Sequence, residues 1–219
     1  MIIYTLIIVL ADVGGLMIKS DIVIIKKLPL FPLKSVLFPG GALSLKVFEP
    51  RYLKMLSQCE KNNMGFGICL IKEGEEVGQV AQVFSLGTMV EITFWEHRHD
   101  GLLGISVKGR QKFKLLEKYI DESGLLLADI ELLPLERELV LPEQYTAMLD
   151  VLQKIFSVLQ HPYITMEKKY DDACWVGSRL SELLPISKQK KQQLFEMDEP
   201  MARLAMLYDE MLNLGMLSE

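Results

Sequence analysis

The sequence predicts an α+β fold, in which a β-rich part comes first and a group of helices follows. Runs of alternating apolar and polar residues, separated by Pro and Gly, fill most of residues 22–138. Apolar residues then recur at helical spacing through residues 139–219. Between the two, the stretch "PLERELVLP" carries charges and two prolines, as linkers do. We therefore expect twisted sheets or a small barrel with one helix over 22–138, and a helical bundle over 139–219.

Residues 1–21 form an N-terminal extension in this division. The run "MIIYTLIIVLA" is apolar but too short for a bilayer, which takes about 20 residues. No Lys or Arg precedes it, so it lacks the basic region of a secretory signal, which remains an alternative. We expect either that translation begins at Met17 or that these residues form a loose extra strand. The intact mass of the natural protein would decide.

The segment "LPLFPLKSVLFPGGALSLKVFEPRY" at residues 28–52 opens the β-rich part. "FPGG" predicts a corner between two short strands, because Pro presets φ and Gly tolerates positive φ. Pro29 and Pro32 are expected at strand ends or on an edge, since proline cannot donate to a ladder. No Lys-Ser or Lys-Thr follows the glycines, which excludes a Walker loop.

A helix follows this segment. Its apolar face repeats at i, i+3, i+4 and i+7: Tyr52, Met55, Leu56 and Cys59. Pro50 suits its first turn, and Asn62 and Asn63 end it. Asp100-Gly101 then predicts a hairpin between two long β-rich runs.

Four amphipathic helices account for the remainder. They are expected over 142–160, over 170–184, from Ser187 to Phe195 and from Pro200 to Leu212, the last with Met201, Leu204, Ala205, Tyr208, Met211 and Leu212 facing inward. Short connections between such helices are typical of a bundle.

Charge and cysteine content limit the function classes. The net charge of −5 offers no footprint for nucleic acid, whose binders cluster Lys and Arg. Neither half of the chain, residues 1–140 or 141–219, has a charge balance suited to DNA or to an anionic membrane. The three cysteines form no CxxC pair, which argues against a disulfide framework and fits a reducing cytoplasm. Each cysteine is expected to be a small buried hydrophobe.

Two motifs partly match known catalytic or metal-binding patterns. "GISVKG" at 104–109 misses the GxSxG elbow and reads as strand, so Ser106 is interpreted as a strand serine facing solvent. In "EHRHD" at 96–100, His97, His99 and Asp100 are interpreted as a polar hairpin tip, since a zinc site wants three or four ligands. His161, before Pro162, looks like a helix-ending residue. We expect no catalytic residue, cofactor or metal.

The candidate protein-binding residues are aromatic or flexible. They are Trp95, Phe94, Trp175 and Met201. Trp175 falls next to the apolar stripe of its helix, so it either packs inside or anchors a partner.

The order of several motifs resembles the N-terminal substrate-binding domain of the Lon protease family. They are "LPLFPLKSVLFPGGALSLKVFEPRYLKML", "GFGICLIKEGEEVG", "LGTMVEI", "GRQKFKLLE", "LLPLE" and "RLSELLPISKQKKQQLFEMDEPMARL". The resemblance covers residues 24–216 and implies a PUA-like β domain, a helical bundle and binding of protein substrates. No Walker motif is present, so we carry over neither ATP hydrolysis nor proteolysis.

The leading hypothesis is therefore a non-catalytic, cytoplasmic module that binds unfolded or partner polypeptides. It would bind through apolar surface or a groove between the subdomains. A small hydrolase with a site in the inter-domain cleft is the alternative. RNA binding, which PUA-like folds can perform, is the weakest hypothesis because of the acidic charge balance. Self-association is left open.

Overall fold

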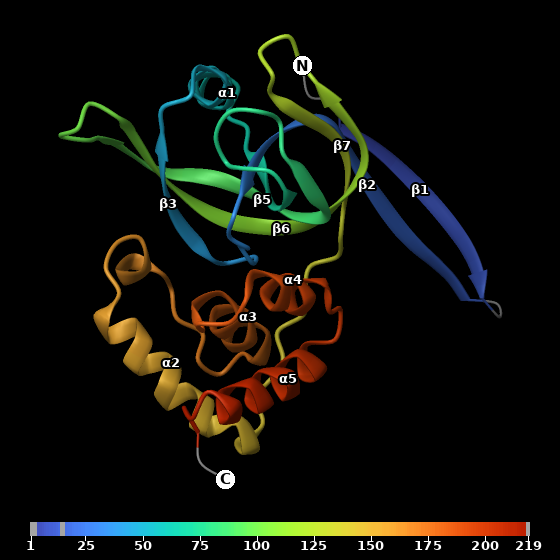
Figure 1. Cartoon of the computed structure of the whole chain (residues 1–219). Helices are drawn as coiled ribbons and strands as arrows, with labels where there is room; N and C mark the ends of the chain where they lie inside the picture. Colours follow the sequence, from blue (N-terminus) through green and yellow to red (C-terminus); the bar gives the residue numbers. More distant parts are fainter. Residues whose placement is uncertain (1–3, 14–15, 218–219) are drawn as a thin grey trace. The chain divides into compact units, whose positions relative to one another are not determined.

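The computed structural model describes residues 4–13 and 16–217, and strands precede most helices along the chain (Figure 1). The strands are β1 (Tyr4–Val13), β2 (Leu16–Leu33), β3 (Ala42–Val47), β4 (Phe66–Glu73), β5 (Gln82–His97), β6 (Leu103–Ile120) and β7 (Leu126–Leu132). The helices are α1 (Pro50–Lys61), α2 (Thr146–Val158), α3 (Ala173–Leu183), α4 (Lys188–Glu196) and α5 (Pro200–Asn213), with short 3-10 turns at Glu143–Tyr145 and Tyr163–Thr165. The α+β class is confirmed.

The strands form one mixed seven-stranded sheet. Its order is β1-β2-β4-β5-β6-β3, and β7 pairs with both β2 and β6. The β2–β4 ladder is parallel, whereas β1–β2, β2–β7, β4–β5 and β6–β7 are antiparallel. Strands β2, β4, β5, β6 and β7 therefore close a circuit of paired neighbours, from which β1 and β3 branch.

Strand β2 changes partner along its length. It runs antiparallel to β7 as far as Pro29, which lies opposite Leu127. From Leu30 it runs parallel to β4, with Pro32 opposite Cys69. Pro29 and Pro32 thus lie inside a long strand rather than at its ends, and of the two expected placements the local edge is the one that agrees with the pairing. Each proline pairs with one neighbour only, so its missing N–H need not interrupt a second ladder.

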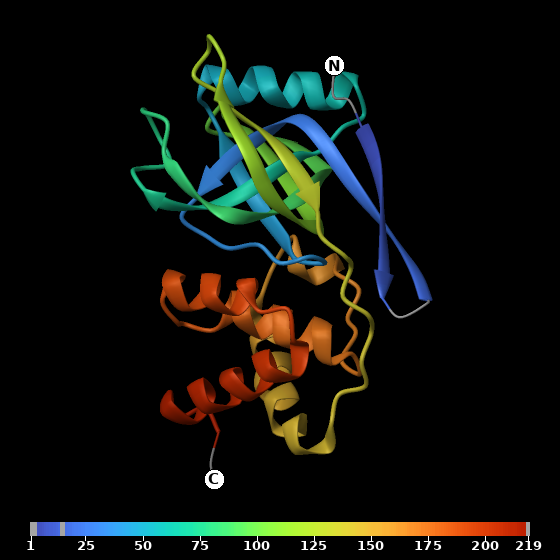
Figure 2. The same cartoon turned by 90° about the vertical axis from the view of Figure 1, so that its right-hand side faces the viewer.

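The N-terminal extension contains a strand. β1 pairs with β2 in an unbroken register from Tyr4–Ile25 to Val13–Leu16. Figure 2 shows this hairpin running beyond the other strands of the sheet. Residues 1–3, 14 and 15, which belong to the same extension, lie outside the described residues. A translation start at Met17 stays a prediction.

The chain divides into two compact units. Unit 1 comprises Met1–Lys34, Val47–Glu91 and Arg110–Pro134. Unit 2 comprises Ser35–Lys46, Ile92–Gly109 and Leu135–Glu219. Unit 2 therefore takes a loop and the end of a hairpin from the β-rich part of the sequence. The division at 22–138 and 139–219 stays a prediction.

The core of unit 1 includes a cluster of residues from the strands, among them Leu30 and Phe113, and α1 packs on β2 by one face. The predicted face of α1, which is Tyr52, Met55, Leu56 and Cys59, is buried. Phe31 of β2 stacks on Tyr52, with ring centroids 4.2 Å apart. Because these side chains leave water together, burial of one α1 face fixes the helix on the strands.

In unit 2, α4 and α5 begin where the sequence predicts, whereas α2 and α3 begin later than expected, at Thr146 and Ala173. The Asp172 carboxylate accepts a hydrogen bond from the Cys174 N–H at 3.0 Å and caps α3. Ser187 caps α4 in the same way, and Pro200 opens α5. On α5 the expected stripe was wrong at Ala205, which is exposed, and it omitted Arg203 and Leu207, which are buried.

Candidate functional site

Backbone groups of the "VLFPGG" corner, residues 36–41, form hydrogen bonds with side chains of α3. The Phe38 N–H donates to Glu182 Oε1 at 2.6 Å, and the Pro39 carbonyl accepts from an Arg179 Nη at 3.0 Å. The Phe38 ring meets the edge of Phe195, with centroids 5.0 Å apart. These contacts, all within unit 2, give the corner a structural role in holding the loop on the helices.

Glu182 and Arg179 are buried together beneath this corner. Arg179 Nε lies 2.8 Å from Glu182 Oε2. Burial raises the pKa of Glu182 to about 7, although Arg179, the Phe38 N–H and Lys191 pull it down. Burial likewise lowers the pKa of Arg179. The pair has no exposed surface for a ligand, so we interpret it as structural.

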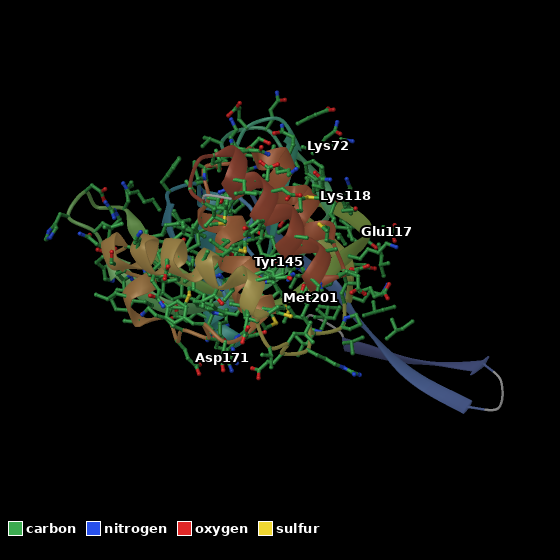
Figure 3. The ribbon with its side chains drawn as sticks, turned by 90° about the horizontal axis from the view of Figure 1, so that it is seen from below. Lys72, Glu117, Lys118, Tyr145, Asp171 and Met201 are labelled. Atoms are coloured by element: carbon green, nitrogen blue, oxygen red, sulfur yellow. The ribbon has the colours of Figure 1, made fainter. Side chains whose placement is uncertain are left out.

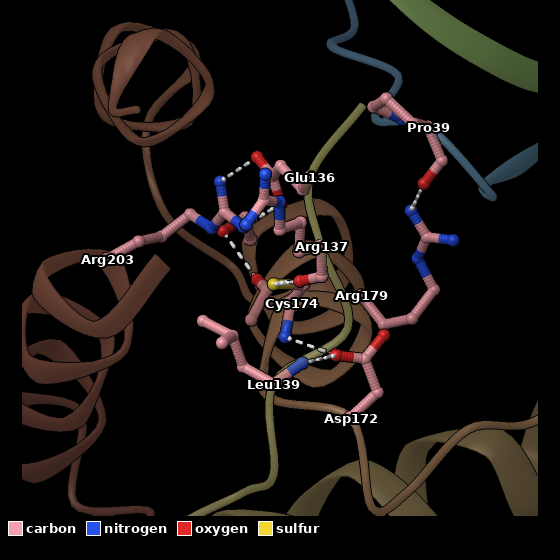
Figure 4. A network of polar contacts seen from close by, with 10 residues as sticks. Pro39, Glu136, Arg137, Leu139, Asp172, Cys174, Arg179 and Arg203 are labelled. Atoms are coloured by element: carbon pink, nitrogen blue, oxygen red, sulfur yellow. Dashed lines mark hydrogen bonds and ion pairs between the residues drawn. The ribbon is translucent and has the colours of Figure 1, made fainter. Parts of the chain in front are cut away.

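A second polar network holds the segment that follows β7 (Figure 4). Arg203, buried on α5, donates to both carboxylate oxygens of Glu136 at 2.8 and 2.6 Å. The Asp172 carboxylate accepts from the backbone N–H groups of Leu139 and Cys174. Bidentate and charge-assisted bonds of this kind fix geometry. The predicted linker is therefore anchored within unit 2.

The "EHRHD" cluster lies at the tip of the β5–β6 hairpin. The Asp100 carboxylate accepts from the Leu102 N–H at 3.1 Å and from Arg98 Nε at 3.1 Å. The Leu102 hydrogen bond, with those from Arg98, lowers the pKa of Asp100. Gly101 turns the chain with φ of +78°. This geometry agrees with a polar hairpin tip.

Ser106 and His161 are brought together, which sequence reasoning missed. Ser106 Oγ lies 3.5 Å from His161 Nδ1 and 3.3 Å from Ser44 Oγ. Ser106 is only 3% exposed, so it does not face solvent as expected. At 3.5 Å the Ser–His contact is at the limit of a hydrogen bond. A buried serine with so long a contact is poorly placed to attack a substrate.

Phe94 lies beside His161, and two further exposed apolar residues are close to His161 in the sequence. The Phe94 ring lies 5.5 Å from the His161 ring and meets it edge to face. Val158 and Ile164 stand three residues to either side of His161 in the chain. The exposed fractions of Phe94, Val158 and Ile164 are 51%, 78% and 68%. We call these three residues the Phe94 patch. The sequence did not indicate Val158 and Ile164 as binding residues, because single apolar residues at helix ends are common.

The other predicted binding residues differ in exposure. Trp95 follows Phe94 on β5 and is half-buried. Trp175 is 8% exposed, with Phe156 stacked on it and Tyr170 at its edge. That burial favours the packing role over the anchoring role for Trp175. Met201, labelled in Figure 3, is half-buried on α5.

The cysteines are buried and free, as predicted. Burial raises the pKa of Cys59 and of Cys174 to about 11, which keeps both thiols protonated. The part of the chain that the structure describes holds no group of three or more His, Cys, Asp or Glu suited to a metal ion. Among the same residues, every helix is too short or too polar to cross a bilayer.

Comparison with known proteins gives a family match over most of the chain. A family model described as the ATP-dependent protease La (LON) substrate-binding domain matches residues 27–213. The crystal structure of a Lon N-terminal domain protein from Xanthomonas campestris is similar, with a TM-score of 0.69 and 31% identity. That alignment covers 84% of this chain and 97% of that one. The N-terminal domain of a Mycobacterium avium complex Lon protease shares the fold, with a TM-score of 0.55 and 16% identity.

Curated relatives match over shorter stretches. A Lon protease of Anaeromyxobacter dehalogenans is 30% identical over 115 residues, which are 52% of this chain and 13% of that protein. The protein cereblon of Gallus gallus is 29% identical over 116 residues, which are 52% of this chain and 24% of that protein. The match thus spans at most a quarter of either relative.

Proposed function

Because this chain belongs to the LON substrate-binding domain family, we propose that it binds unfolded polypeptides through apolar side chains and catalyses no reaction itself. The observation that carries the proposal is the Phe94 patch, where three large apolar side chains are more than half exposed. Large exposed apolar side chains are typical of interaction surfaces.

The patch suits an extended apolar segment. Phe94 comes from a hairpin and is oriented by its contact with His161, so its ring is held in place rather than free to collapse. Covering apolar surface contributes about 2.5 kcal/mol per 100 Å² before the costs of association. A small patch of this kind favours weak, reversible binding to many sequences. The proposed partners are unfolded or partner polypeptides rather than nucleic acids.

The fold supports two finer proposals. We infer that the closed circuit of β2, β4, β5, β6 and β7 with α1 is a PUA-like domain. We also infer that α2 to α5 act as a helical bundle that carries one side of the binding surface. The contacts of α3 with α4 and α5, and the complete burial of Leu180, Leu204 and Phe195 on those helices, support the latter.

A titration with an unfolded chain tests the proposal. The probe is a reduced, carboxymethylated casein-like protein that carries a fluorescent label, and the readout is its fluorescence anisotropy. We expect saturable binding that weakens severalfold in Phe94→Ser and in Ile164→Ser. Ile120→Ser is the matched control, because Ile120 is also exposed but belongs to unit 1.

The far-UV circular dichroism of each variant checks that it is folded. Absence of binding to the folded wild type at high micromolar concentration would refute the proposal. If Ile120→Ser weakens binding as much as Phe94→Ser does, the Phe94 patch is not the binding surface.

A further inference from the structure

Strand β1 has one unpaired edge among the strands that the structure describes. It lies at the end of the strand order and pairs there with β2 alone. The ribbon formed by residues 6–13 and 16–23 also has no third described strand beside it, because β2 meets β7 only from Ile24 onward. A two-stranded ribbon is marginally stable in water. This ribbon therefore calls for a further strand or surface to cover it.

One face of the ribbon is almost wholly apolar. Residues directly opposite in an antiparallel ladder share a face. By the observed register, the positions that share the face of Val9 are Thr5, Ile7, Ala11, Val13, Leu16, Ile18, Ser20, Ile22 and Ile24. Only Thr5 and Ser20 are polar. The opposite face is also mostly apolar but includes three charged residues, Asp12, Lys19 and Asp21.

The edge of β1 lacks the residues that normally prevent strand pairing. Natural edge strands are often short or carry Lys or Pro. Strand β3, which ends the strand order on the other side, has six residues and includes Lys46. Strand β1 has ten residues, and Asp12 is its one charged residue.

We propose that the edge of β1 pairs antiparallel with β1 of a second copy of this chain, forming a two-fold dimer. The charge pattern selects this occupant. Pairing about Ile8 or Val9 places Asp12 opposite Tyr4 or Leu6 of the partner subunit and keeps the two Asp12 positions at opposite ends of the pair. All other pairs join apolar residues or Thr5, so the strand is complementary to itself.

This surface is distinct from the Phe94 patch. The family model begins at residue 27, after β1 and most of β2. Self-pairing through β1 is therefore an inference about this chain and does not rest on the shared family role. Loss of the dimer would leave the polypeptide binding of unit 2 intact.

Sedimentation velocity of the full 219-residue chain tests the dimer. We expect a concentration-dependent shift from 25.0 kDa to twice that mass. Val9→Lys brings two lysines opposite or diagonal to each other across the pair, which disfavours pairing. It should yield a monomer. Ser20→Lys is the matched control, since Ser20 lies opposite Val9 within the ribbon but one strand in from the edge. It should remain dimeric.

Cysteine cross-linking provides a second readout. A cysteine at position 8 or 9 should form an intersubunit disulfide under mild oxidation, whereas Val13→Cys should not, because it lies at an end of the pair. The native cysteines are buried and do not compete. A monomeric wild type, a dimer unaffected by Val9→Lys, open-ended aggregates, or capture of an added extended peptide by β1 in place of a second copy would each overturn the inference.

Discussion

Arg179 and Glu182 form an ion pair in the interior of unit 2, with Arg179 Nε 2.8 Å from Glu182 Oε2 and at most 6% of either side chain exposed. Each partner also holds the proline-glycine corner, Arg179 through the Pro39 carbonyl and Glu182 through the Phe38 N–H. Two charges that are costly to bury thus connect loop 35–41 to α3.

Removal of the cation should destabilise the protein strongly. Arg179→Met keeps an apolar stem but leaves Glu182 without its cation and the Pro39 carbonyl without its donor. Breaking a buried pair costs about 3–5 kcal/mol, and we expect a loss in that range. Urea unfolding at pH 8, where Glu182 is largely ionised, measures it. The control is Lys190→Met, which breaks the partly exposed Lys190–Glu210 pair and should cost less than about 1 kcal/mol.

Stability should fall as pH rises between about 4.5 and about 7. Burial raises the pKa of Glu182 from 4.5 to about 7, so the folded chain holds this proton more tightly than the unfolded chain. The resulting stabilisation is complete below the unfolded pKa and is lost as pH rises through the folded pKa. Glu182→Gln removes this dependence. The difference in unfolding free energy between wild type and variant, followed against pH, isolates it from other carboxylates. A constant difference would contradict the prediction.

Gly41 should not tolerate a side chain. A Cβ at Gly41 would lie 2.2 Å from Glu182 Oε1 and 2.9 Å from Leu37 Cδ1. Overpacking of this kind costs about 1–3 kcal/mol, which thermal and urea unfolding of Gly41→Ala would show. Gly177→Ala is the matched control, because its Cβ would meet Leu204 at an ordinary 3.4 Å. It lies within α3, where Ala exceeds Gly by about 1 kcal/mol in helix propensity, so stability should be kept or increased.

The contact between Ser106 and His161 should support no hydrolysis. Ser106 is buried and its distance to His161 Nδ1 is long, so neither attack nor proton transfer is favoured. We expect p-nitrophenol to be released from p-nitrophenyl acetate, and labelled peptides from fluorescent casein, at the same background rate with wild type, Ser106→Ala and His161→Ala. Hydrolysis above background that disappears in both variants would establish the hydrolase alternative.

Local patterns allowed the elements to be predicted well. The α1 face, the Gly101 turn, the start of α4 after Ser187 and the Pro200 start of α5 each depend on residues a few positions apart. The same local patterns did not reveal that β2 is one long strand, in which a change of pairing partner lets the prolines lie inside the strand.

The buried charges could not be predicted, because their partners are remote in sequence. Arg179 donates a hydrogen bond to the Pro39 carbonyl, 140 residues away in the sequence, and Arg203 donates to Glu136, 67 residues away. Arginine is normally a surface residue, and nothing in the helical periodicity indicated otherwise. The patch was found only in part for the same reason. Phe94 was named from sequence, but its neighbour His161 became visible only in the fold.

The split composition of unit 2 bears on how this protein can be taken apart. A fragment of residues 135–219 would lack Phe38 and the 92–109 hairpin, both of which belong to the same compact unit. The space beside Phe195 would be left open, and Arg179 and Glu182 would lose the main-chain groups that they bind. A C-terminal fragment produced by a single truncation should therefore be insoluble. A circularly permuted or co-expressed protein that restores residues 35–46 and 92–109 should fold, because its core is complete.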